Sequence, residues 1–233
     1  MRNFEEQLKE VSRKMKEFVE SGQMKQLQRY CEIISNLQKL GKDYNWVVVS
    51  TDINTNIKNK DELEINKYFL SLIDNNIDLY QSIKNEIFGC SYVTEKQKLI
   101  KQIFDAIDHK NYWIACIGLS TVLEFLLAIE SDFNSIKISV LLKNFKDNVG
   151  NIDIKEYEVG FLFSLDGFLE NYSIPTNGFE REKEPKYINR HWIAHGRMYR
   201  ELTKVDTYQI LFAIYAMIRI MDMERRVKLQ EDI

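Results

Sequence analysis

Apolar residues recur at intervals of three or four along most of this chain, which is the spacing of one face of an α-helix. The pattern predicts an all-α protein. The predicted helices cover residues 4–18, 24–37, 61–88, 94–108, 112–129, 136–147, 155–171, 186–195 and 203–229. The first two predict an antiparallel hairpin, whose apolar stripe either packs on the body of the same chain or pairs with another subunit. The apolar run Trp46–Val49 that follows is expected to be extended.

Residues typical of helix ends indicate where several of these helices stop and start. Gly41 is expected to end the second helix. Thr94 and Gln97 have the spacing of a capping box, which predicts that a new structural unit begins just before them. We therefore predict two domains, an N-terminal helical region over residues 1–89 and a helical bundle over residues 90–233.

Other small and polar residues predict a helix crossing, a helix start and a loop. Gly160 and Gly167 lie on one face of a predicted helix and are expected to permit a close crossing with another helix. Thr203 and Asp206 have the spacing of an N-terminal cap for the last helix. The polar segment 173–184 is expected to be a loop, either solvated without a role or acting as a lid for the residues after it.

Composition and charge narrow the class of protein. The 233 residues have a net charge of −3, which argues against a non-specific nucleic-acid coat protein. Positive charge is concentrated in residues 186–204. The three cysteines form no CxxC pair, so no structural zinc site is expected. The N-terminus has no secretory signal and the longest apolar stretches are interpreted as buried helices, so we expect a cytoplasmic protein without a membrane partner.

The segment with the clearest chemistry is NRHWIAHGR, which contains His191 and His195. Imidazole is the usual proton shuttle near neutral pH, and the guanidinium of Arg190 matches phosphate oxygens. The segment therefore predicts a site that acts on a phosphodiester. The histidine spacing also suits a metal, but Trp192 stands where the zinc motif of this spacing has glutamate. We expect metal-free acid–base chemistry and no cofactor.

The expected geometry of this segment makes the site incomplete on one helix. Pro185 suits the first turn, and Gly196 the C-terminal cap, of a helix over residues 186–195. On such a helix Arg190 and His195 lie about 140° apart, so they do not share a face. Either the length of the arginine side chain or an irregular first turn brings the guanidinium of Arg190 to the face that carries His195, or a second copy of the helix from a dimer partner completes the site.

The spacing of Arg190, polar His191 and His195 resembles the Arg-x4-6-His signature of the HEPN superfamily. The resemblance covers residues 90–229, where a capped helix, an apolar helix with one embedded acid, the motif helix and an apolar closing helix follow in the same order. It implies an antiparallel four- or five-helix bundle that dimerises so that two motifs face one cleft. Many members of this superfamily are metal-independent endoribonucleases of toxin–antitoxin or antiviral systems.

By this resemblance the chain is an endoribonuclease that cleaves RNA by attack of a 2′-hydroxyl on the adjacent phosphate. His195 would be the general base or acid, His191 would orient the site or transfer a second proton, and Arg190 would stabilise the charged transition state. Asn189 would support the site. The implied partners are RNA, a second copy of the chain, and an antitoxin or other defence-system protein. The alternatives are a non-catalytic module that binds RNA, nucleotide or protein, and a structural helical subunit.

Residues around the motif extend the candidate site. Glu124 is the only charged residue of the apolar helix, and because a buried carboxylate needs a partner we expect Arg190, or another basic residue, beside it. For Trp192, packing in the core is favoured over base stacking. The chain departs from one toxin subgroup of the superfamily, because it has Arg197 at the position of a tyrosine that the antitoxin of that subgroup modifies. The candidate RNA contacts, which are basic or aromatic, are Lys186, Tyr187, Arg197, Tyr199 and Arg200.

Overall fold

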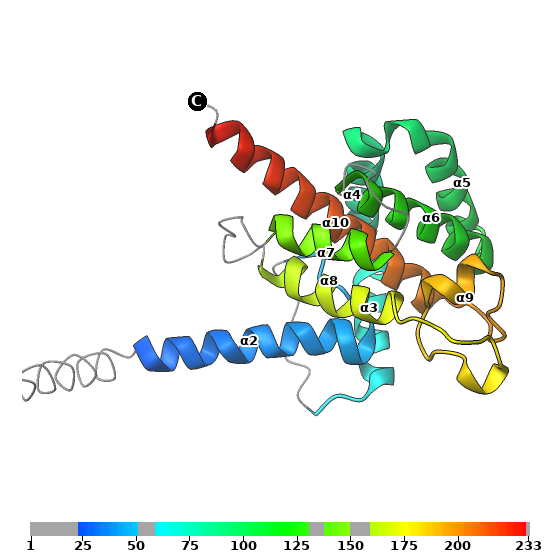
Figure 1. Cartoon of the computed structure of the whole chain (residues 1–233), viewed down its shortest axis with the longest axis horizontal. Coiled ribbons are helices and arrows are strands. Elements are labelled where there is room, and N and C mark those ends of the chain that lie inside the picture. The colour runs from blue at the N-terminus through cyan, green and yellow to red at the C-terminus, as the bar shows by residue number, and fades with distance from the viewer. Residues whose placement is uncertain (1–22, 51–58, 131–137, 150–158, 232–233) are drawn as a thin grey trace, which may run out of the picture.

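The computed structural model describes residues 23–50, 59–130, 138–149 and 159–231, and these contain helices and no strand (Figure 1). The predicted all-α class is confirmed. The helix predicted over residues 4–18 lies outside the described residues, so the hairpin stays a prediction. The α-helices are α2 (Gln23–Tyr44), α3 (Glu62–Asp74), α4 (Ile77–Gly89), α5 (Gln97–Asp108), α6 (Tyr112–Glu130), α7 (Ile138–Val149), α8 (Val159–Tyr172), α9 (Arg190–Ala194) and α10 (Lys204–Glu231).

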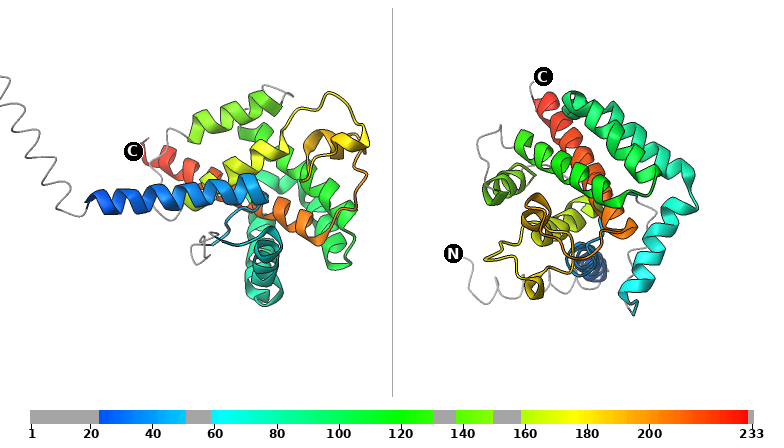
Figure 2. Two further views of the ribbon diagram at one scale, coloured as in Figure 1. Left: turned by 90° about the horizontal axis from the view of Figure 1, so that it is seen from below. Right: turned by 90° about the vertical axis from the view of Figure 1, so that its right-hand side faces the viewer.

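Helices α6 and α10 lie at the centre of the molecule (Figures 1 and 2). Helix α10 packs against both α6 and α8, and α5 packs against α6. Every residue from Asp206 to Ile218 is buried, as the apolar sequence of this helix predicts. Within the described part of the chain, α6 is the one helix long and apolar enough to cross a membrane, and half of its apolar window is buried inside the molecule.

Helix α2 packs along α8 at a crossing where two glycines meet. A Cβ atom on Gly41 would lie 2.1 Å from the carbonyl oxygen of Ser164, and one on Gly167 would lie 2.7 Å from the carbonyl oxygen of Gln38. No side chain fits at these distances, so the crossing requires glycine on both helices. Elements from both sides of the predicted domain boundary at residue 89 meet here, and the division itself stays a prediction.

This crossing corrects two predictions. Gly41 does not end α2, which continues to Tyr44, because the glycine serves the contact with α8. Gly167 forms the predicted close crossing, but Gly160 does not take part in it. A Cβ atom on Gly160 would lie 3.5 Å from the nearest side-chain atom, on Val48, which is ordinary van der Waals contact.

The helix predicted over residues 61–88 is in fact two helices. Helix α3 begins with a capping box in which Asp61 and Glu64 each accept a hydrogen bond from the other's backbone N–H. It ends at Asp74, and the side chain of Asn76 then caps α4 by accepting a backbone N–H of the first turn. Periodicity missed this break because apolar positions continue on both sides of it.

The capping box predicted from Thr94 and Gln97 does not form. Residues Ser91–Lys96 make a short 3₁₀-helix, η1, and α5 begins at Gln97 without a side-chain cap. The hydroxyl of Thr94 donates instead to the carbonyl of Ser91, and the amide of Gln97 donates to the carbonyl of Phe88. These two side chains therefore hold the junction between α4 and α5.

The run Trp46–Val49 is non-helical and buried. The indole of Trp46 stacks on Phe69 with ring centroids 4.6 Å apart, and the N–H of Val48 donates to the hydroxyl of Ser164 at 3.0 Å. The segment therefore joins α2 to the core through both apolar and polar contacts.

Candidate active site

The motif segment lies at one end of the bundle, beside the start of α10 (Figures 1 and 2). Its helix, α9, has only five residues, Arg190–Ala194, instead of the predicted span 186–195. Pro185 is therefore not in its first turn. The helix begins one residue after Asn189, whose side-chain oxygen accepts the backbone N–H groups of the second and third helical residues at 3.0 and 3.4 Å.

The C-terminal end of α9 is closed by Gly196, as predicted. Gly196 has a φ of +61°, in the left-handed region that favours glycine. Its N–H bonds to the carbonyl of Ile193 at 3.1 Å, and the N–H of Arg197 bonds to the carbonyl of Trp192 at 2.8 Å. This is the Schellman pattern. Caps at both ends make the helix short and place His195 at its C-cap.

Asn189 anchors the start of the motif to the rest of the protein. The residue is 1% exposed. While its oxygen caps α9, its amide nitrogen donates to the carbonyls of Asn171 and Ile174, at 3.2 and 3.0 Å, at the end of α8. Its position is that of a supporting residue, because it determines where α9 begins relative to α8.

Arg190 lies against Glu124 of α6, which confirms the pairing inferred from the sequence. The Nε atom of Arg190 is 2.8 Å from Oε1 of Glu124. The contact is an ion pair without the straight N–H geometry of a hydrogen bond. The two side chains are 21% and 29% exposed, so the pair lies at the edge of the core and remains in contact with solvent.

Behind this pair lies Tyr172, a fully buried residue at the end of α8. Its hydroxyl is hydrogen-bonded to the hydroxyl of Ser120 and lies 3.5 Å from Oε1 of Glu124. Burial, and then the charge of Glu124, raise the pKa of Tyr172 far above its ordinary value, so the phenol stays protonated. Neither Tyr172 nor Ser120 was predicted from the sequence. The available signal was that Ser120 precedes Glu124 by one helical turn in an otherwise apolar helix.

His191 lies within the electrostatic influence of the other motif residues. Burial lowers its pKa first, the positive charge of Arg190 and the neighbouring His195 lower it further, and Glu124 acts in the opposite direction. His191 is therefore neutral near pH 7 and can accept a proton. The backbone N–H of His195 bonds to the carbonyl of His191 at 3.2 Å, so the two histidines lie one turn apart as their spacing predicts.

His195 is exposed and borders the loop that precedes the motif. Its ring centroid is 5.4 Å from that of Phe179, which also meets the edge of Trp192 at 5.2 Å. Trp192 is 2% exposed, so the favoured core interpretation is confirmed. Phe179, which we did not predict, ties the loop to the motif. The segment 173–184 is a loop with a short 3₁₀ turn, as predicted, and its role as a lid stays a prediction.

Three of the five predicted RNA contacts are held by the protein's own groups. Lys186 pairs with Glu62 at 2.7 Å, and the hydroxyl of Tyr187 donates to the backbone carbonyl of Asp43. The guanidinium of Arg200 forms two hydrogen bonds with a single carboxylate, at 3.0 and 2.7 Å. These contacts hold the segment in this conformation, and the role of the three side chains in binding RNA stays a prediction.

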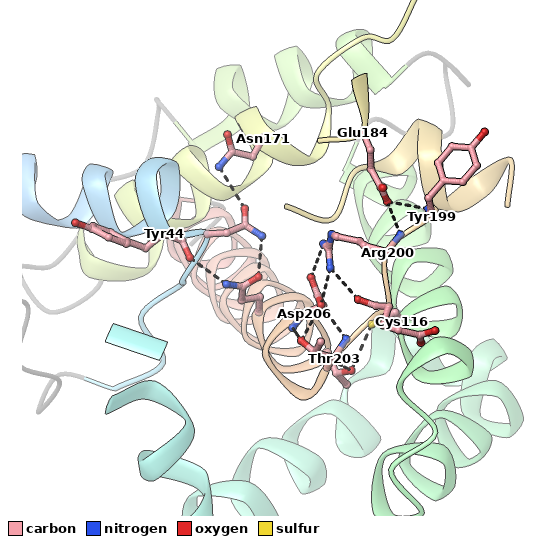
Figure 3. Close-up of polar contacts among 12 residues, drawn as sticks. Tyr44, Cys116, Asn171, Glu184, Tyr199, Arg200, Thr203 and Asp206 are labelled. Atoms are coloured by element: carbon pink, nitrogen blue, oxygen red, sulfur yellow. Dashed lines mark hydrogen bonds and ion pairs between the residues drawn. The ribbon is translucent and has the colours of Figure 1, made fainter. Parts of the chain in front are cut away.

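The carboxylate that holds Arg200 belongs to Asp206, and the network around it fixes the loop to α10 (Figure 3). Asp206 accepts the backbone N–H and the hydroxyl of Thr203 at 2.8 and 2.9 Å, which confirms the predicted cap of α10. On the other side, Glu184 accepts the backbone N–H groups of Tyr199 and Arg200 at 2.8 and 3.0 Å. The residues on both sides of α9 are therefore tied to the start of α10.

The other two predicted RNA contacts, Arg197 and Tyr199, are exposed. The guanidinium carbon of Arg197 lies 5.9 Å from the ring centroid of Phe179, and the hydroxyl of Tyr199 donates to the carbonyl of Phe179 at 3.1 Å. Both side chains therefore lie on the surface next to His195, where a bound molecule can reach them.

A depression of about 300 Å³ lies beside the Arg190–Glu124 pair. It is lined by residues of α6 and α9, which are Ile117, Ser120, Thr121, Glu124, Ile193 and Ala194. Two large apolar side chains on α6, Ile114 and Ile117, are about half exposed at 55% and 48%. Among the described residues, no group of three His, Cys, Asp or Glu side chains is placed to hold a metal ion.

Comparison with known proteins found no relative of this chain. No family model matches the chain, and neither the curated proteins nor the solved structures contain a significant match.

Proposed function

We propose that this chain is a metal-independent endoribonuclease of the HEPN type that cleaves cytoplasmic RNA in a defence or toxin–antitoxin system. The observation that carries the proposal is the arrangement around α9. One guanidinium is held by a carboxylate, one imidazole is kept neutral, and a second imidazole is exposed at the helix end. Each group is attached to a short helix that is capped at both ends.

The proposed reaction needs two proton transfers and charge stabilisation. His191 is suited to accept the proton of a ribose 2′-hydroxyl, because its pKa is lowered. The 2′-oxygen then attacks the adjacent phosphorus, and the bond from phosphorus to the 5′-oxygen of the next nucleotide breaks. His195 is the proposed donor of the proton that the leaving oxygen takes up. Arg190 stabilises the negative charge of the transition state, and the products are a 2′,3′-cyclic phosphate and a free 5′-hydroxyl.

We propose that a second copy of the chain completes the catalytic cleft. The exposed Ile114 and Ile117 on α6 lie next to the depression that borders Glu124, and they supply apolar surface for such a contact. Arg197 and Tyr199 remain exposed beside His195 and are the proposed contacts to phosphate and base. An antitoxin or other defence-system protein is a further proposed partner.

The test is cleavage of total RNA by the purified protein in excess EDTA. Wild type is expected to cut, and Arg190→Ala and His195→Ala are each expected to lose at least about a hundredfold in rate, the usual effect of removing such a group. The matched control is His109→Ala, because His109 is the remaining histidine of the chain and lies at the exposed end of α5.

Three results would count against the proposal. A folded, dimeric wild-type protein that binds RNA, nucleotide or a protein without cutting RNA would favour the non-catalytic module. Activity that EDTA removes and zinc restores would favour a metal site. An equal loss in His109→Ala would show that the effect is not specific to the motif.

A further inference from the structure

We propose that Tyr172 is a positioning residue for the site, and that its hydroxyl orients the Glu124 carboxylate that holds Arg190. The kinetic consequence of this inference rests on the proposed function, whereas its structural consequence does not. Among the described residues, Tyr172 forms hydrogen bonds with Ser120 and Glu124. It acts through Glu124, which belongs to α6 and makes the ion pair with Arg190.

The position of the Tyr172 hydroxyl is determined by its surroundings. The ring is fully buried and stacks on Phe168 with centroids 5.9 Å apart and planes 16° apart. The hydroxyl is bonded to the hydroxyl of Ser120, and its oxygen is 3.5 Å from two acceptors, Oε1 of Glu124 and the backbone carbonyl oxygen of Ser120. When Ser120 donates to the phenol, the single phenolic proton faces the carboxylate, which is the charged and therefore stronger acceptor of the two, and the ring cannot leave this place without opening the core.

The contacts of Glu124 explain why such a donor matters. Its contacts with Arg190 and with Tyr172 use the same oxygen, Oε1. A partly exposed glutamate on a helix has several accessible rotamers. The donor from Tyr172 favours the rotamer in which Oε1 meets Arg190. Without it, the carboxylate would turn toward water more often, and the guanidinium would lose its fixed partner.

The end of α8 is a suitable reference point for both parts of the site. Its last turn places Tyr172 beside Glu124, and the carbonyl of the preceding Asn171 accepts the amide of Asn189, which starts α9. The turn itself is anchored through the side chain of Asn171, which donates to Asn45 at 3.3 Å, and Asn45 in turn donates to Gln209 of α10 at 3.1 Å (Figure 3).

The experiment compares Tyr172→Phe with a matched control elsewhere in the protein. The control is Tyr215→Phe, because the hydroxyl of Tyr215 donates to Glu86 at 3.3 Å and Glu86 pairs with Arg219 at 3.1 Å. This repeats the tyrosine–glutamate–arginine arrangement with residues of α4 and α10. Both substitutions delete one oxygen and keep the ring.

Two readouts are measured on both variants. Tyr172→Phe is expected to lower kcat for RNA cleavage about tenfold with little change in KM, the rate equivalent of one hydrogen bond to a charged group. It is also expected to speed hydrogen exchange at Nε–H of Arg190, observed by NMR without any RNA. Tyr215→Phe is expected to change neither. Ser120→Ala, which removes the other partner of the phenol, is expected to shift both readouts in the same direction by a smaller factor, and it replaces Tyr172→Phe if that variant fails to fold.

The two readouts separate this inference from the proposed function. If wild type cuts no RNA, the proposed function fails, and the exchange rate at Arg190 still decides the role of Tyr172. The inference is wrong if kcat and Arg190 exchange in Tyr172→Phe equal those of wild type. It is equally wrong if Tyr215→Phe produces the same changes.

Discussion

Replacing Glu124 with glutamine removes the charge opposite Arg190 while keeping the size of the side chain. At the observed 2.8 Å, the gross attraction of this pair is about 1.5 kcal/mol in a water-like medium and about 6 kcal/mol at an effective dielectric constant of about 20. Water screens the pair, because the two side chains are 21% and 29% exposed. We therefore expect a net loss of only about 1 kcal/mol in the free energy of unfolding.

The effect of Glu124→Gln on catalysis is expected to exceed its effect on stability. The loss of a fixed guanidinium is expected to lower kcat about tenfold or more, because a displaced Arg190 no longer meets the transition-state charge. Glu124 also raises the pKa of His191, against the larger effects that lower it. In the variant that pKa falls further, so the acidic limb of the pH–rate profile moves to lower pH.

The assay pairs urea denaturation with single-turnover cleavage of an RNA oligonucleotide across a pH series. Glu86→Gln is the control, since Glu86 makes an equivalent pair with Arg219 away from the motif. It is expected to cost similar stability and no activity. Unchanged kcat in folded Glu124→Gln, or an equal loss in Glu86→Gln, would refute the reasoning.

Three further predictions test the geometry of the site and its scaffold. In an NMR titration, His191 is expected to have a pKa below its ordinary value. Arg190→Gln is expected to raise the pKa of His191, because it removes a positive neighbour, and a lower pKa in that variant would contradict the assigned cause. Asn189→Ala is expected to cost about 2 kcal/mol in thermal or urea unfolding, because it removes a helix cap and the hydrogen bonds to two partly buried carbonyls. A loss below about 0.5 kcal/mol would show that the cap is dispensable. Gly167→Ala is expected to destabilise the protein by at least about 2 kcal/mol, because the new Cβ atom would clash with the backbone of α2, whereas Gly160→Ala is expected to stay within about 1 kcal/mol of wild type. Similar melting temperatures for the two variants would contradict the requirement for glycine at the crossing of α2 and α8.

Sequence periodicity located α6 and α10 well, but it missed the break between α3 and α4 and the true length of α9. Helices α6 and α10 follow continuous apolar patterns, because each buries residues in successive turns. Helix α9 is shorter than predicted, because Asn189 caps it and Pro185 lies in the preceding loop. An asparagine can cap a helix or remain in its interior, and here its bonds to the end of α8 decide which.

The chemistry of the site was only partly accessible from sequence. The pairing of Glu124 with Arg190 could be inferred, because a lone carboxylate in an apolar helix needs a partner. The partner of Arg200 could not be inferred, because its hydrogen bond to Asp206 depends on the conformation of the turn between them. Tyr172 was hidden for a similar reason. Its hydroxyl finds its partners on α6, far away in the sequence, and nothing local in its sequence indicates that contact.

The most direct test of the central claim is the chemistry of the RNA ends. A defined single-stranded RNA is incubated with purified wild type in EDTA, and the fragments are analysed by mass spectrometry. The account predicts fragments ending in a 2′,3′-cyclic phosphate and beginning with a 5′-hydroxyl, formed by wild type and by His109→Ala but not by Arg190→Ala or His195→Ala. Intact RNA with folded wild type, or fragments with 5′-phosphate ends, would contradict it.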